Sequence, residues 1–108
     1  MEEGGNATVL FTTVPDQETA VKIGEVLVCE RLAACCTIIP STQSIYMWEG
    51  EVQREAELLL MIKTTQMGYS KLHDRLMELH PYDLPELLAL PVLYGSEPYL
   101  EWIRTSTR

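Results

Sequence analysis

The stretch SIYMWEGEVQREAELLLMIKT, residues 44–64, contains two extended runs around a single glycine. Gly50 supplies the turn, so the stretch predicts a β-hairpin. From Val52 to Glu57 apolar and polar residues alternate, as in a strand with one face in water, whereas from Leu58 to Ile62 both faces become apolar. The chain has too few helices to cover both faces of a sheet. A partner subunit is therefore the natural cover for the second face.

Before the hairpin, the sequence predicts a strand, a helix and a second strand. Residues 7–15, ATVLFTTVP, are β-branched and apolar, as in a strand. Asp16 is a good N-cap for the helix that follows, which we expect to end near Arg31. The extended segment over residues 32–48 leads into the hairpin, with a bulge or bend at Pro40. The helix is predicted from one apolar stripe, formed by Ala20, Ile23, Gly24, Leu27 and Val28.

After the hairpin, the sequence predicts a helix, a strand and a short last helix. Residues 69–80 are amphipathic with a helical period and end at Pro81, and a strand follows over residues 85–95. The last helix begins at Ser96. The order β-α-β-β-α-β with a short C-terminal helix predicts an α+β fold. This order is typical of a ferredoxin-like sandwich, in which an antiparallel sheet carries both main helices on one face.

Length and charge restrict the classes of protein and partner. The 108 residues suffice for one domain with a modest core, and we expect a flexible tail over residues 1–6 and a single domain over residues 7–108. The net charge of −8 repels nucleic acid and anionic membrane surfaces. The acidic N-terminus does not resemble a secretory signal. Three cysteines, an odd number, fit a reducing compartment, so we expect a cytoplasmic protein.

Five stretches together resemble the CutA family, and in order and spacing the resemblance covers nearly the whole chain from Thr8 to Ile103. The resemblance implies a ferredoxin-like domain that forms a compact homotrimer, similar to the PII nitrogen-signalling proteins. It also implies a role in the response or tolerance to divalent metal ions, most often copper. The stretches are CERLAACCTIIP, SIYMWEGEV, ELLLMIKT, LHPYDLPELLALPV and SEPYLEWI.

The resemblance transfers a metal site only in part. Family members with a copper assignment have a cysteine in the first strand and two successive histidines before the PY that follows the second helix. Here those positions hold Thr12, Leu79 and His80, so only His80 matches. One imidazole supplies one ligand, while tightly held copper or zinc needs three or four. We expect weak binding of copper or another divalent cation at His80, or a structural role for His80 at the helix C-terminus.

A second candidate site is a cleft between subunits. Tyr46 and Trp48 lie on one face of the hairpin, where they either pack against a partner subunit or form a wall of the cleft. Tyr82 and Glu86 lie in a loop stiffened by two prolines. Lys63 lies on the same strand face as Glu57 and, with His80 and Glu86, is a candidate for the polar rim.

Three functional hypotheses follow from these residues. The first is a trimeric CutA-like protein of metal-ion response. The second is a trimeric scaffold that docks another protein. The third is an enzyme or small-ligand sensor that uses the intersubunit cleft around Lys63, His80 and Glu86. The sequence contains no GxxxxGK loop, HExxH or paired CxxC motif, so we expect a protein that is not an enzyme.

Overall fold

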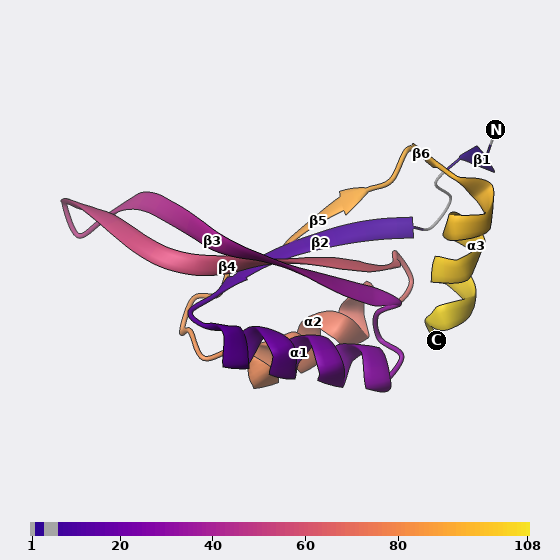
Figure 1. Ribbon diagram of the computed structural model, residues 1–108, viewed down its shortest axis with the longest axis horizontal. Helices are drawn as coiled ribbons and strands as arrows, with labels where there is room; N and C mark the ends of the chain where they lie inside the picture. Colours follow the sequence, from indigo (N-terminus) through magenta and orange to yellow (C-terminus); the bar gives the residue numbers. More distant parts are fainter. Residues whose placement is uncertain (1, 4–6) are drawn as a thin grey trace.

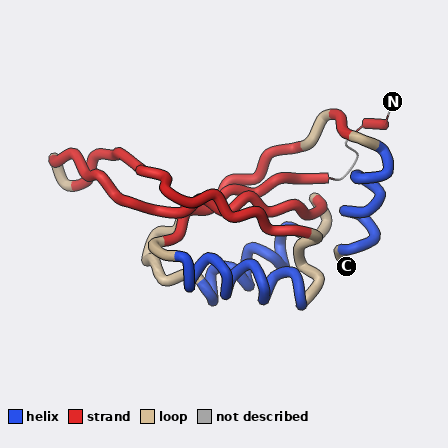
Figure 2. The backbone as a smooth tube through the Cα atoms, in the orientation of Figure 1, coloured by secondary structure: helices blue, strands red, loops and turns tan. Residues whose placement is uncertain are grey.

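The computed structural model describes residues 2–3 and 7–108 (Figure 1). Four strands form one antiparallel sheet in the order β3-β4-β2-β5. Helices α1 and α2 cover one face of this sheet, and α3 lies at its end (Figure 2). The predicted α+β, ferredoxin-like fold is therefore confirmed. The bounds are β2 Ala7–Val14, α1 Gln17–Cys29, β3 Cys35–Trp48, β4 Glu51–Thr65, α2 Tyr69–Leu79, β5 Leu88–Pro91 and α3 Glu97–Ser106.

A second, two-stranded sheet pairs a segment near the N-terminus with the segment just before α3. Strand β1 (Glu2–Glu3) pairs antiparallel with β6 (Tyr94–Gly95). The expected flexible tail comprised residues 1–6, of which residues 1 and 4–6 lie outside the described residues.

Helix α1 begins as its sequence predicts, and it buries the predicted apolar stripe except Val28, which is exposed. The Asp16 side chain accepts a hydrogen bond from the backbone amide of Thr19 at 2.8 Å, which satisfies one of the unpaired amides of the first turn. The helix packs closely on β3 at Gly24, where an added Cβ would lie 3.3 Å from the Cys36 sulfur. The buried residues of the helix are Ala20, Ile23, Gly24 and Leu27.

The main core lies between the helices and the sheet. Alternate residues of β2 and β4 point toward the helices, because side chains on a strand alternate between its faces. The amphipathic helix α2 contributes two leucines and α1 an isoleucine and a leucine. The largest buried side chains of this core are Leu10, Val14, Ile23, Leu27, Leu60, Ile62, Leu72 and Leu76.

The β3–β4 hairpin projects beyond the helices as an arm (Figure 1). Its turn places Glu49 and Gly50 at positive φ, as tight hairpin turns require. The predicted irregularity near Pro40 is a bulge, since the register shifts between Ile39 and Thr42 and Ser41 has a φ of 61°. The molecule is consequently elongated, with principal extents of 46 × 26 × 23 Å.

The face of the sheet opposite α1 and α2, here called the outer face, is also apolar. Residues directly opposite each other in an antiparallel sheet share a face. Phe11 pairs with Met61, and Leu59 pairs with both Thr13 and Ile39. The apolar side chains of this face are half-buried or exposed, and they comprise Val9, Phe11, Ile39, Leu59, Met61, Leu88 and Leu90.

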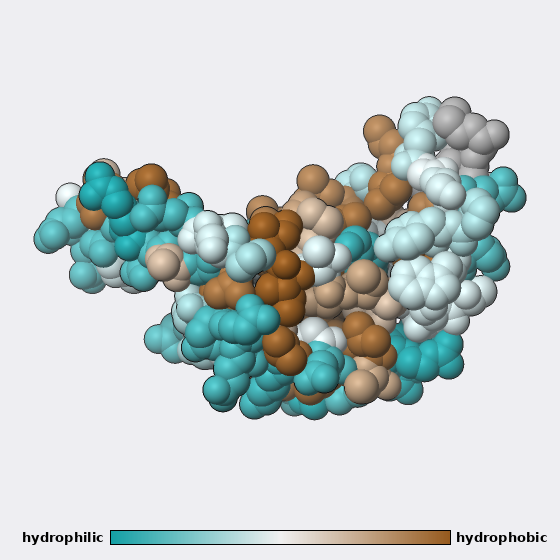
Figure 3. Space-filling model, in the orientation of Figure 1, coloured by the Kyte–Doolittle hydropathy of each residue, from teal (hydrophilic) through white to brown (hydrophobic). Residues whose placement is uncertain are grey.

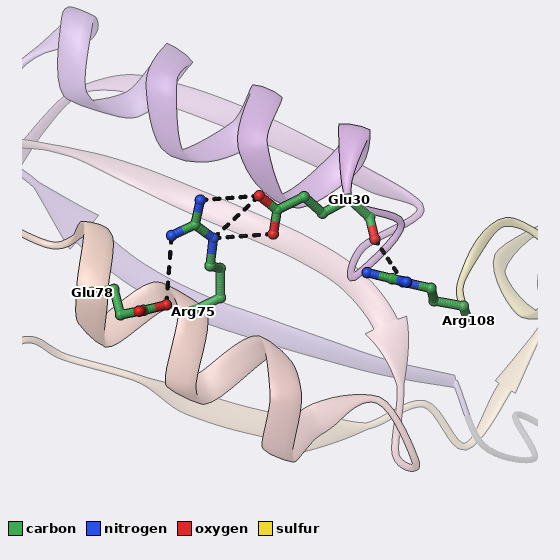
Figure 4. A network of polar contacts seen from close by, with 4 residues as sticks. All are labelled: Glu30, Arg75, Glu78 and Arg108. Carbon is green, nitrogen blue, oxygen red and sulfur yellow. Dashed lines mark hydrogen bonds and ion pairs between the residues drawn. The ribbon is translucent and has the colours of Figure 1, made fainter.

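Ion pairs and backbone contacts join the helices and the C-terminus (Figure 4). The guanidinium of Arg75 on α2 donates to both carboxylate oxygens of Glu30, just after α1, at 3.0–3.2 Å. It also contacts Glu78 at 3.5 Å. The Arg108 side chain donates to the Glu30 carbonyl at 2.9 Å, so Arg108 binds the backbone just after α1.

Candidate functional site

An open pocket of about 1130 Å³ lies between the hairpin arm and the loop over residues 81–86. Of the six residues predicted for a cleft, five line this pocket; they are Tyr46, Trp48, Glu57, Tyr82 and Glu86. The first three come from β3 and β4, and the last two from the loop between α2 and β5. The fold thus brings together two segments that are separated by the whole of α2.

Glu57 forms the contact between the two walls of the pocket. Its side chain is only 7% exposed, and its carboxylate accepts a hydrogen bond from the Tyr82 hydroxyl at 2.7 Å. Burial and this contact with Glu57 raise the pKa of Tyr82, so the phenol remains protonated and donates. The backbone carbonyl of Glu57 accepts from the Thr42 hydroxyl at 2.7 Å, which fixes β4 beside the bulge.

The hairpin supplies an aromatic wall. Tyr46 and Trp48 share one face of β3, with Trp48 more than half exposed. The Tyr46 hydroxyl lies 3.5 Å from the Glu55 carboxylate. Burial, followed by the negative charge of Glu55, raises the pKa of Tyr46. Figure 3 shows hydrophobic residues at the end of the arm as well as along the junction of the sheet with α1.

All ionisable side chains that line the pocket are carboxyls or phenols. Asp83 also lines the pocket, and sequence reasoning missed Glu55 as a lining residue. Glu55 could have been found, because it lies two residues before Glu57 on the same strand face. Burial, followed by the negative charge of Glu57, raises the pKa of Glu86. The pocket is therefore a region of concentrated negative charge.

His80 lies behind the pocket, with both ring nitrogens in hydrogen bonds. Its Nε2 lies 2.8 Å from the Thr13 carbonyl oxygen, which can only accept, so we assign the proton to Nε2. Its Nδ1 accepts from the Tyr82 backbone amide at 3.2 Å. His80 is buried and is also the C-cap of α2, where its backbone amide donates to the Leu76 carbonyl. The ring of this helix-terminating histidine thus bonds β2 and the loop after the helix, rather than the last carbonyls of α2.

These residues do not fit a tight copper site. Neither nitrogen of His80 offers a free lone pair, and Leu79 supplies no ligand. Thr12 is fully buried on the helix-covered face of β2, and its hydroxyl has no hydrogen-bond partner among the described residues. Within residues 2–3 and 7–108, no group of three or more His, Cys, Asp or Glu side chains is arranged to hold a metal ion.

Lys63, the sixth predicted cleft residue, does not line the pocket. Its ammonium donates to the Thr37 hydroxyl at 2.6 Å and lies 3.9 Å from the Cys35 sulfur. Lys63 shares a strand face with Glu57, as predicted, but it lies six positions further along β4, a distance of about 20 Å. Within one chain, the structure does not bring Lys63 to His80 and Glu86.

The sequence and fold match one protein family. Residues 8–106 match the CutA1 divalent ion tolerance protein family. The chain belongs to this family. The divalent-cation tolerance protein CutA of Thermus thermophilus is 50% identical over 99 residues, which are 92% of this chain and 96% of that protein.

Two further comparisons extend the likeness to a plant protein and a solved structure. The chloroplastic protein CutA of Arabidopsis thaliana is 44% identical over 111 residues, which cover all of this chain and 61% of that protein. The crystal structure of CutA from Xylella fastidiosa superposes with a TM-score of 0.94 at 41% identity, and the match covers 96% of this chain and 100% of that one.

No helix within the described residues is long and apolar enough to cross a membrane.

Proposed function

We propose that the chain forms a homotrimer and acts in the response to divalent metal ions, the role after which its family is named. We propose also that it binds such ions only weakly and catalyses no reaction. The observation that supports the proposed trimer is the apolar outer face of the sheet. Phe11, Leu59 and Met61 lie at its centre, opposite α1 and α2. A second subunit on this face would remove these side chains from water, a gain of about 25 cal/mol for each Å² buried.

Light scattering tests the trimer. We expect a mass about three times that of the 12.3 kDa chain at micromolar concentration. A monomer at that concentration would contradict the proposal.

We propose further that the role in metal response does not depend on tight copper binding at His80. The support is the hydrogen bonding of both ring nitrogens, one of which must break before His80 can bind a metal. We expect calorimetric titration with Cu²⁺ to give a weak isotherm that His80→Gln leaves unchanged. His73→Gln, at a half-buried histidine of α2, is the matched control. A tight isotherm lost in His80→Gln and kept in His73→Gln would establish His80 as a ligand.

The same proposal holds that the chain catalyses no reaction, and the pKa of Cys36 supports this part of it. Burial, followed by the neighbouring Cys35, raises the pKa of Cys36 to about 11. The Cys36 thiol is therefore protonated at neutral pH and is a poor nucleophile. We also propose a cytoplasmic location, which the three free thiols support.

A second candidate function is small-ligand binding in the pocket. The observation that favours it is the convergence of the hairpin arm and the 81–86 loop on one concave site. In the proposed trimer this site would serve as a sensor cleft. A scaffold that docks a protein would need no such pocket.

A further inference from the structure

We propose that the pocket between the hairpin arm and the 81–86 loop binds an aliphatic polyamine, with Glu57 and Glu86 pairing with its ammonium groups and Trp48 contacting its methylene chain. The inference rests on the second candidate function, in which the pocket is a ligand cleft. It specifies the chemical class of the ligand.

The first argument is the buried charge of Glu57. A glutamate residue that is more than nine-tenths buried ordinarily has a cationic partner, because removing a carboxylate from water is costly. Among the described residues, the only side chain bonded to the Glu57 carboxylate is the Tyr82 phenol, which is neutral and reaches one oxygen. The other oxygen has no bonded partner there. An ammonium group bound in the pocket would supply the missing positive charge.

The second argument is the spread of negative charge around the cavity. Glu55 and Glu57 line it from the hairpin, and Asp83 and Glu86 line it from the loop. Burial raises the pKa of Glu86, and repulsion from the negative charge of Glu57 raises it further. A cation between the two walls would relieve this repulsion.

The third argument distinguishes a polyamine from a metal ion. The carboxylates are not grouped closely enough for three of them to hold one ion within the described residues. A chain with several ammonium groups can instead pair with carboxylates at separate points. The exposed indole of Trp48 and the ring of Tyr46 offer apolar faces for the methylene segments and π-faces for the ammonium groups.

The test is calorimetric titration of the whole protein with spermidine in about 0.15 M NaCl, where salt screens non-specific attraction to the acidic surface. We expect saturable binding with one site per chain. Glu57→Gln keeps an acceptor for Tyr82 but removes the charge, and we expect it to weaken the affinity about tenfold or more. Glu86→Gln, at a more accessible carboxylate, should have a similar effect and carries the test alone if Glu57→Gln does not fold.

The matched control is Glu18→Gln, which removes the same charge from an exposed position on α1. We expect it to change the affinity less than twofold. Binding that all three variants weaken equally, or that is absent from the unaltered protein, overturns the proposal. Complete displacement of spermidine by an equal concentration of MgCl₂ also overturns it, since the site would then be one for divalent ions.

Light scattering on the same samples separates this inference from the proposed trimer. A trimer that does not bind spermidine refutes the polyamine site alone. A monomer refutes the proposed assembly, whatever the result of the titration.

Discussion

At the scale of single residues, two buried threonines predict opposite effects of the same substitution. The Thr64 hydroxyl donates to the Leu32 carbonyl at 2.8 Å, whereas the Thr12 hydroxyl is buried without a partner in the described chain. Valine has nearly the shape of threonine but no hydroxyl. We expect Thr12→Val to raise the free energy of unfolding by about 1 kcal/mol and Thr64→Val to lower it by about 1–3 kcal/mol. Chemical denaturation measures both, and a change of the same sign in the two variants would contradict this account.

The residue scale also shows how far sequence reasoning could reach at the candidate site. Its position before Pro81 predicts His80 at a helix C-terminus, and the structure places it there as the C-cap. The bond from the ring to the Thr13 carbonyl joins residues 67 positions apart. No local pattern reports such a contact, so the sequence could not tell a free imidazole from one with both nitrogens bonded. That distinction decides whether the ring can bind a metal.

At the scale of helices, the contact between α1 and α2 predicts a pH dependence. The hydrogen bonds from Arg75 lower the pKa of Glu30 below its ordinary value of 4.5. Between the lowered and the ordinary value the unfolded chain binds more protons, so the stability rises with pH. The stabilisation of the fold by the ionised Glu30 is complete above about pH 4.5 and is lost as the pH falls through the lowered pKa.

We therefore expect Arg75→Gln to flatten the dependence of the free energy of unfolding on pH below about pH 4.5. Urea denaturation across that range provides the measurement. Lys71→Gln is the control, because it removes the same charge from an exposed position of the same helix. An equally steep dependence in Arg75→Gln and the unaltered protein would show that the Glu30 contact contributes nothing to it.

The sheet shows which features of an element are visible in a sequence. Alternation and one glycine predicted the hairpin, and Pro40 predicted the irregularity now seen as the bulge before Thr42. The pairing of β1 with β6 was not predicted, since a two-residue strand has no measurable period. The prediction that placed Lys63 in the cleft was incomplete for a related reason. The parity of residue numbers gives the face of a strand, but a site also depends on the distance along it.

At the scale of the whole molecule, the outer face of the sheet sets the last prediction. Met61 lies at the centre of this face, between Phe11 and Thr37. If three chains bury the face, a lysine there places an ammonium group in an apolar interface without a partner. Met67 lies in the turn before α2 and is 86% exposed, so the same change there adds the same charge without burying it.

We expect Met61→Lys to destabilise the assembly by at least about 3 kcal/mol and to reduce the mass in light scattering from that of a trimer toward that of one chain. Met67→Lys should retain the trimer mass and a nearly unchanged thermal midpoint. Because both variants carry the same net charge, a difference between them reports burial in the interface rather than charge repulsion between chains. A Met61→Lys protein that keeps both the trimer mass and the thermal midpoint would place the subunit interface on another surface.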